Sequence, residues 1–90
     1  MIRVSISPRI ARDIEQRAPD HLPVDKLTPG TAALTVEEVR ALLADAQFNS
    51  NRRCVDVGPD CMPVATFNAY AALARQIERR LAQLGLREYA

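Results

Sequence analysis

The chain contains 90 residues with twelve basic and eleven acidic side chains, so its net charge is only +1. This length fits a single domain spanning residues 1–90, because independent domains usually contain roughly 50 to 250 residues. The balanced charge excludes a uniformly basic coat protein for nucleic acid and an acidic mimic of DNA, and two tyrosines with two phenylalanines are too few for a base-stacking platform.

The N-terminal segment predicts a strand followed by a short helix. Residues 2–6 alternate apolar and polar side chains, a period of two that is typical of a half-buried strand. Ser7 fits the N-cap of a helix with proline at its first position, and Pro19 ends that helix. Asp13 and Arg17 are four residues apart, so we expect them to pair on the outer side of the helix for a few tenths of a kcal/mol.

Residues 19–34 contain three prolines and a glycine, and the sequence predicts a connection without regular structure. Its spaced leucines and valine indicate that the connection is held against the core, and it is a second place where a partner could bind. The next helix is the clearest element. It opens with Thr35 and Glu38 in the pattern of a capping box, and its apolar positions recur at helical spacing to about residue 48.

Residues 52–62 contain valines and a Gly-Pro-Asp turn, and they predict a second short strand that pairs with residues 2–6. Cys54 and Cys61 lie in this segment. In a reducing compartment they are expected to be free thiols, while a disulfide and a metal site stay open as alternatives.

The longest helix is predicted over residues 63–84, with Gly85 placed to end it. Its apolar stripe consists of Phe67, Tyr70, Ala71, Ala74, Ile77, Leu81 and Leu84. The predicted fold class is therefore α-dominated small α+β, with three helices, a short N-terminal strand and a two-stranded ribbon if that strand finds a partner.

Arginines gather on the opposite face of this last helix, and Arg75, Arg79, Arg80 and Arg87 are the candidate partner-binding residues. Arg75 and Arg79 are like charges four residues apart, which slightly destabilises an isolated helix, so the face could serve to bind an anionic partner. A protein partner, a nucleic acid and a plain solvated helix face are the three interpretations. The low net charge conceals an uneven distribution of charge along the chain. Residues 20–48 carry five acids against two bases, while the segments on either side are basic.

Arg3, Ser5 and Ser7 alternate along the first strand, just before the first helix. Residues 2–18 thus resemble the opening of ribbon-helix-helix DNA-binding proteins, in which two chains pair their strands and the outward strand residues enter the major groove. The resemblance implies a dimer whose DNA-binding residues are Arg3, Ser5 and Ser7. The pattern departs from that family after residue 18, because the family joins its two helices by a short turn.

Enzymatic chemistry has little support in the sequence. Three glycines do not provide a phosphate-binding loop, and no metal-ligand motif is present, so we expect no cofactor, no metal and no enzymatic activity. Cys54 or Cys61 with His21 as base is the remaining catalytic alternative.

The sequence contains no signal-peptide pattern and no span long enough for a membrane, so a cytosolic location is expected. In general character the chain is similar to small accessory proteins of phages and mobile elements, such as anti-CRISPR proteins. The predicted function is therefore protein binding that blocks a host complex sterically.

Overall fold

The computed structural model describes residues 1–51 and 64–85. Its elements in chain order are β1 (Ile2–Ile6), α1 (Pro8–Arg17), a single 3-10 turn η1 (Val24–Lys26), β2 (Gly30–Leu34), α2 (Val36–Asn51) and α3 (Val64–Gln83). Three helices and a two-stranded antiparallel sheet confirm the predicted fold class. No helix in the described part of the chain is long and apolar enough to cross a membrane.

The strand that pairs with β1 is β2, in an antiparallel register that runs from Ile2 opposite Leu34 to Ile6 opposite Gly30. The prediction of a connection without regular structure over residues 19–34 is therefore wrong, because residues 30–34 supply a strand that pairs with β1. Alanines in β2 have weak strand propensity, and prolines precede them, so nothing local marked this strand. Residues 52–62 themselves lie outside the described residues.

The local signals at the helix ends are confirmed. The Ile10 amide donates to Ser7 Oγ (3.3 Å), which makes Ser7 the N-cap of α1. At the start of α2 the Glu38 amide donates to Thr35 Oγ1 (3.1 Å), and the Thr35 amide donates to Glu38 Oε1 (2.9 Å). These two reciprocal bonds form the predicted capping box.

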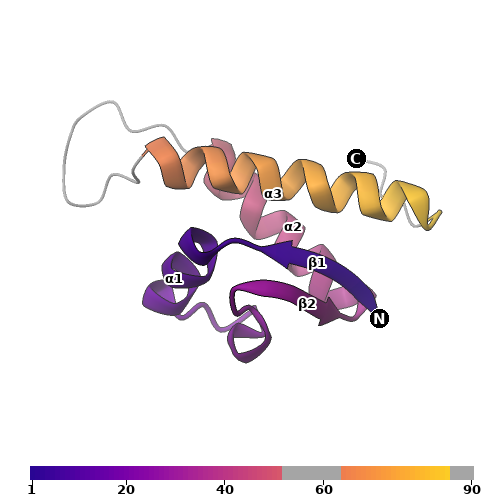
Figure 1. Cartoon of the computed structure of the whole chain (residues 1–90), viewed down its shortest axis with the longest axis horizontal. Helices are drawn as coiled ribbons and strands as arrows, with labels where there is room; N and C mark the ends of the chain where they lie inside the picture. Colours follow the sequence, from indigo (N-terminus) through magenta and orange to yellow (C-terminus); the bar gives the residue numbers. More distant parts are fainter. Residues whose placement is uncertain (52–63, 86–90) are drawn as a thin grey trace.

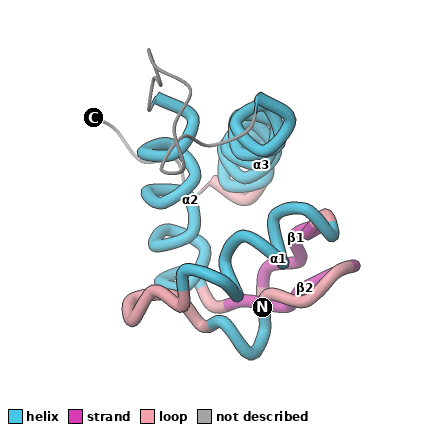
Figure 2. The backbone as a smooth tube through the Cα atoms, turned by 90° about the vertical axis from the view of Figure 1, so that its left-hand side faces the viewer, coloured by secondary structure: helices cyan, strands magenta, loops and turns pink. Residues whose placement is uncertain are grey.

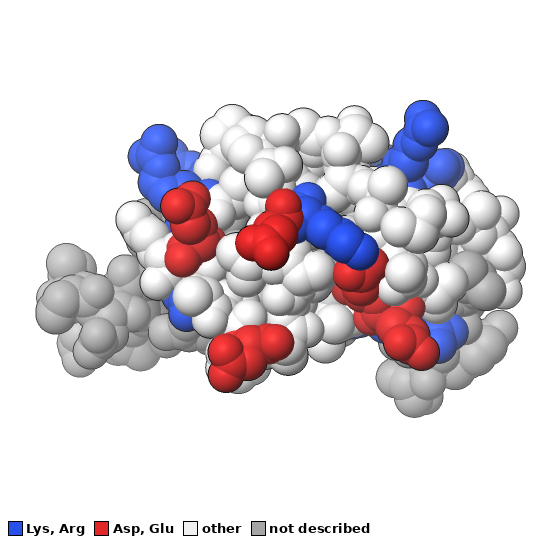
Figure 3. All heavy atoms as spheres, turned by 90° about the horizontal axis from the view of Figure 1, so that it is seen from below, with Lys and Arg blue, Asp and Glu red and all other residues white. Residues whose placement is uncertain are grey.

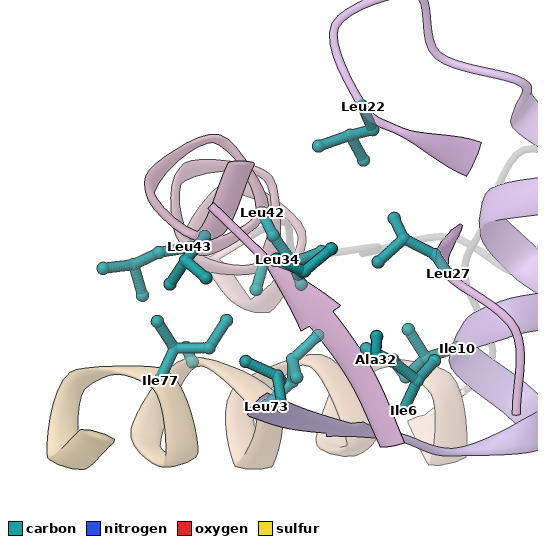
Figure 4. Packing of buried hydrophobic residues seen from close by; sticks show 14 of the residues in the cluster. Ile6, Ile10, Leu22, Leu27, Ala32, Leu34, Leu42, Leu43, Leu73 and Ile77 are labelled. Atoms are coloured by element: carbon teal, nitrogen blue, oxygen red, sulfur yellow. The ribbon is translucent and has the colours of Figure 1, made fainter. Parts of the chain in front are cut away.

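The elements are arranged around one apolar core (Figures 1 and 2). α3 runs along β1 on the side away from β2, α2 lies behind the sheet and α3, and α1 covers one end. Figure 4 shows Leu34 of the sheet, Leu42 of α2 and Ile77 of α3 meeting at the centre, with Leu22 and Leu27 reaching in from the connection. The leucines of residues 19–34 thus hold this segment against the core, as the sequence indicated.

The apolar stripe of α3 differs from the prediction at its edges. Tyr70, Ile77 and Leu81 are buried, but Leu84 is 48% exposed, and Leu73, which the stripe omitted, is buried. Leu84 lies beyond the last turn of α3, where neither α2 nor the sheet covers it. The stripe therefore ends one turn earlier than its spacing suggested.

Candidate functional site

The predicted arginine face of α3 is exposed in the structure. Arg75, Arg79 and Arg80 all lie on the solvent side of the helix, while Arg87 is outside the described residues. In the described ranges none of the three forms an ion pair. Their only side-chain hydrogen bond there is donated by Arg80 Nη1 to Gln83 Oε1 (3.4 Å). Their guanidinium groups are therefore presented to solvent without an internal carboxylate.

Gln76, which lies next to Arg75 on α3, binds the sheet. Its Nε2 donates to the Ser5 carbonyl (3.2 Å), and its Oε1 accepts from the Ser5 amide (2.8 Å). The side-chain amide thus pairs with β1 much as a neighbouring strand would, and it fixes α3 alongside the edge of β1. The helix that carries the arginines is consequently held at a defined distance from the sheet.

This contact places Arg3 near Arg80. β1 and α3 run in opposite directions (Figure 1). From the contact between Ser5 and Gln76, earlier residues of β1 and later residues of α3 therefore lie toward the same end of the molecule. Two residues back along β1 cover about 7 Å and four residues forward along α3 cover about 6 Å. Arg3 is exposed and has no ion-pair partner among the described residues. We define the arginine surface as Arg3, Arg75, Arg79 and Arg80.

Acidic side chains gather on a different side of the molecule. β2 lies across β1 from α3, and it is flanked by η1 and the first turn of α2, the part of the chain richest in acids. Figure 3, seen from below Figure 1, shows acidic side chains spread over the middle of this face, with one basic side chain between them and other basic side chains toward its margins. The acidic block of the sequence therefore gathers on one face, although basic side chains are present there too.

Lys26 is a cation of this acidic region, and it is paired. Its Nζ contacts both carboxylate oxygens of Glu38 (2.9 and 3.1 Å). The bond from the Thr35 amide, followed by the contact with Lys26, lowers the pKa of Glu38. Lys26 is exposed and Glu38 is half-buried, so this ion pair links η1 to α2 but adds little to the stability of the fold.

A second arginine site, absent from the sequence prediction, lies between the three helices. Arg17 of α1 contacts both oxygens of Asp45 on α2 (3.0 and 3.3 Å), and its Nε donates to Asp13 Oδ2 (2.9 Å). Arg17 Nη2 also contacts the Tyr70 hydroxyl of α3 (2.7 Å), which in turn donates to Asp13 Oδ2 (2.5 Å). We call Asp13, Arg17, Asp45 and Tyr70 the polar cluster.

Burial shapes the electrostatics of the polar cluster. The Asp45 side chain is only 5% exposed and that of Arg17 30%. Burial opposes the charge of Arg17, but hydrogen bonds with Asp45, Tyr70 and Asp13 outweigh it and raise the pKa of Arg17. Burial and the bond to Asp13 likewise raise the pKa of Tyr70. Arg17 therefore keeps its charge and Tyr70 keeps its hydroxyl proton at neutral pH, so their hydrogen bonds persist there, which suits a structural joint between helices.

Asn49 extends the polar cluster along α2. Its Nδ2 donates to the Asp45 carbonyl (2.8 Å) and to Asp45 Oδ2 (3.1 Å), while its buried Oδ1 has no partner among the described residues. His21 Nε2 lies 3.6 Å from Asp45 Oδ1, with a side chain 62% exposed. The sequence did carry a signal here, because Asp45 and Asn49 are polar residues four apart on the otherwise buried face of α2.

Two other candidate residues, Ser5 and Ser7, belong to neither the arginine surface nor the polar cluster. Ser5 and Ser7 of the predicted DNA-binding set are exposed, but Ser7 Oγ is used by the helix cap and the Ser5 backbone by Gln76. Cys54 and Cys61 lie outside the described residues, so their state stays a prediction. Within residues 1–51 and 64–85 no group of three or more His, Cys, Asp and Glu side chains is arranged to hold a metal ion.

In the described part of the chain, two open surface hollows adjoin these sites. One, of about 460 Å³, lies where α1 meets the start of α3, and it includes Arg9, Arg12 and Thr66. The other, of about 370 Å³, lies beside Gln76 between the sheet and α3, and small side chains line most of it. In the first hollow Arg9 Nη1 donates to Thr66 Oγ1 (3.4 Å).

No known protein-family model, curated protein or solved structure matches this chain. Functional conclusions therefore rest on the charges and contacts of the chain itself.

Proposed function

We propose that this chain is a small protein-binding module whose arginine surface binds an acidic surface of another protein. The observation that carries the proposal is the set of exposed guanidinium groups without a described carboxylate partner. Elsewhere in the same chain Arg17 and Lys26 are both paired. Arginine is enriched at protein interfaces, where its planar group can bind a carboxylate through two hydrogen bonds.

The scaffold supports binding because it fixes the helix that presents these groups. α3 is joined to β1 through Gln76 and to α1 through Tyr70, at two points separated by nearly two turns. A rigid helix loses little conformational freedom on binding, which favours affinity. The proposed action is steric: a partner covered by this surface cannot bind its normal ligand there.

Nucleic acid is the competing anionic partner, but one observation counts against the dimer that the N-terminal resemblance implies. In that arrangement β1 pairs with β1 of a second chain. Here β1 pairs with β2 of the same chain, and Gln76 bonds the Ser5 backbone on its other edge. Both edges of β1 are therefore occupied, and the experiment below treats nucleic acid as an alternative outcome.

The test is capture of host proteins on the immobilised chain, compared between two charge-reversed variants. Arg75→Glu with Arg79→Glu alters the arginine surface. Arg9→Glu with Arg12→Glu changes the net charge equally on α1, where both side chains are exposed. We expect an acidic protein to be retained by the native chain and the α1 variant but lost from the α3 variant, with all three chains equally folded by circular dichroism.

Two results contradict the proposal. If both variants lose the captured protein equally, the attraction depends on total charge and not on the arginine surface. If nuclease treatment releases everything that the native chain retains, the partner is nucleic acid.

A further inference from the structure

The two edges of the small sheet differ in a way that the proposed function does not use. The edge of β1 is closed, because Gln76 bonds both the amide and the carbonyl of Ser5. Since these two groups point away from β2, Ser5 and its cross-strand neighbour Thr31 form a non-hydrogen-bonded pair. The backbone amide and carbonyl of Thr31 therefore point to the outer edge of β2, and those of Ala33, two residues on, do the same.

This outer edge of β2 lies beside η1 (Figure 1), but its backbone groups are not paired within the described part of the chain. No described residue hydrogen-bonds the outward backbone groups of Thr31 or Ala33, and both residues are exposed. Edge strands of natural proteins usually carry a charge, a proline or a bulge that prevents pairing with other chains. The segment Gly30–Leu34 has none of these, since its sequence is Gly-Thr-Ala-Ala-Leu and its register with β1 is continuous.

We propose that the outer edge of β2 binds the same edge of a second copy of this chain, which joins the two sheets into one antiparallel four-stranded sheet. The pattern is self-complementary about Ala32. With a two-fold axis at Ala32, Thr31 of each copy lies opposite Ala33 of the other, and each such pair exchanges two hydrogen bonds. Four backbone bonds form, and every outward group of the two residues is used.

The side chains at the axis and the arginines of the sheet are compatible with this arrangement. The closest pair across the axis is Ala32 with Ala32 of the second copy, at about 4.5 Å between Cα atoms, where alanine is small enough. The axis is perpendicular to the sheet, so the helices of both copies lie on the same face. The nearest exposed like charges on the sheet are the two Arg3 side chains, which are three strand spacings apart and offset by two residues along the strands, or about 16 Å in all. This separation exceeds the Debye length of about 8 Å at physiological salt, so their repulsion is screened.

Cysteine cross-linking tests the register directly, in a background of Cys54→Ser and Cys61→Ser. Ala32→Cys places two thiols opposite each other in a non-hydrogen-bonded pair, within the distance that a disulfide needs. Ala33→Cys is the matched control. It is more exposed, but the two-fold axis puts its two copies about 9 Å apart, beyond disulfide reach. We expect mild oxidation to give a covalent dimer at least about tenfold faster for Ala32→Cys, and equal or slower formation for Ala32→Cys overturns the proposal.

The oligomeric state of the unmodified chain gives a second measurement. Sedimentation across a concentration series should show a reversible monomer–dimer equilibrium. Ala33→Pro removes the outward amide of Ala33 and two of the four bonds, so it should raise the dimer dissociation constant about tenfold or more. A native chain that is monomeric at every soluble concentration contradicts the proposal, and so does a dimer that Ala33→Pro leaves unchanged while circular dichroism shows it folded.

Discussion

Arg17 and Arg79 are the same residue type on neighbouring helices, yet their surroundings are opposite. Arg17 contacts two carboxylates and a tyrosine hydroxyl where three helices meet. Arg79 projects into solvent and has no ion-pair partner among the described residues. The partners of Arg17 come from all three helices, so its charge is used to hold the fold. The charge of Arg79 is left available to a partner.

This contrast separates stability from binding within one chain. A half-buried guanidinium leaves an uncompensated charge behind when it is lost, whereas an exposed one leaves only solvent. Substitutions in the polar cluster should therefore alter unfolding, and substitutions on the arginine surface should alter binding alone.

Arg17→Ala should have the largest effect on folding. The substitution leaves the Asp45 carboxylate buried without its cation, and it removes the joint between α1 and α2. Breaking a buried ion pair from one side costs about 3 to 5 kcal/mol, and the partial exposure of Arg17 reduces this to about 2 to 3 kcal/mol. Urea unfolding followed by circular dichroism measures the change. Arg12→Ala, an exposed arginine on the same helix, is the control and should change the free energy of unfolding by less than about 0.5 kcal/mol. Equal effects of the two substitutions would show that the cluster adds nothing.

Tyr70→Phe should have a smaller effect, and one that depends on pH. The ring stays in the core, but the hydroxyl bonds to Asp13 and Arg17 are lost, at a cost of about 1 to 2 kcal/mol. Because the pKa of Tyr70 is raised above its ordinary value of 10.0, the native state holds this proton more tightly than the unfolded state. The resulting stability is complete below pH 10 and decreases as the pH rises above it.

The measurement is the urea midpoint of both proteins at about pH 8 and about pH 11. The native chain should lose more stability between these two values than Tyr70→Phe, so the difference between the two proteins narrows at alkaline pH. A constant difference would mean that Tyr70 does not titrate with unfolding.

Periodicity and caps made most of the fold predictable. The alternation of residues 2–6, the capping box at Thr35 and the stripe around Ile77 are local patterns, and each appears in the structure where it was expected. β2 was missed because Ala32 and Ala33 pack as a strand only when β1 is beside them. Strand formation there depends on the tertiary context more than on the residues themselves.

The site was predictable only in part, for the same physical reason. Exposed arginines on a helix follow from helical spacing, so the exposure of Arg75 and Arg79 was predictable, while their role in binding stays a prediction. The polar cluster joins Arg17 to Asp45, 28 positions away, and to Tyr70, 53 positions away. The pair of Asp13 and Arg17 was predicted from its spacing, but only as a weak contact on the outer side of the helix. The role of Gln76 was likewise not predicted, because no local pattern shows that a glutamine hydrogen-bonds the edge of a distant strand.

Arg79→Gln should have the smallest effect on folding and should separate the two arginine environments most clearly. The substitution keeps a long polar side chain on α3 and removes the repulsion with Arg75, four residues earlier. Relieving a like-charge pair of this kind stabilises a helix by about 0.2 to 0.5 kcal/mol, and the gain should shrink as salt is added. Urea unfolding at low and at high salt measures it. If the arginine surface binds an acidic protein, the same variant should retain less of that protein in the capture experiment. A variant that is both less stable and unchanged in binding would place Arg79 with Arg17 as part of the fold and would remove the distinction between the two sites.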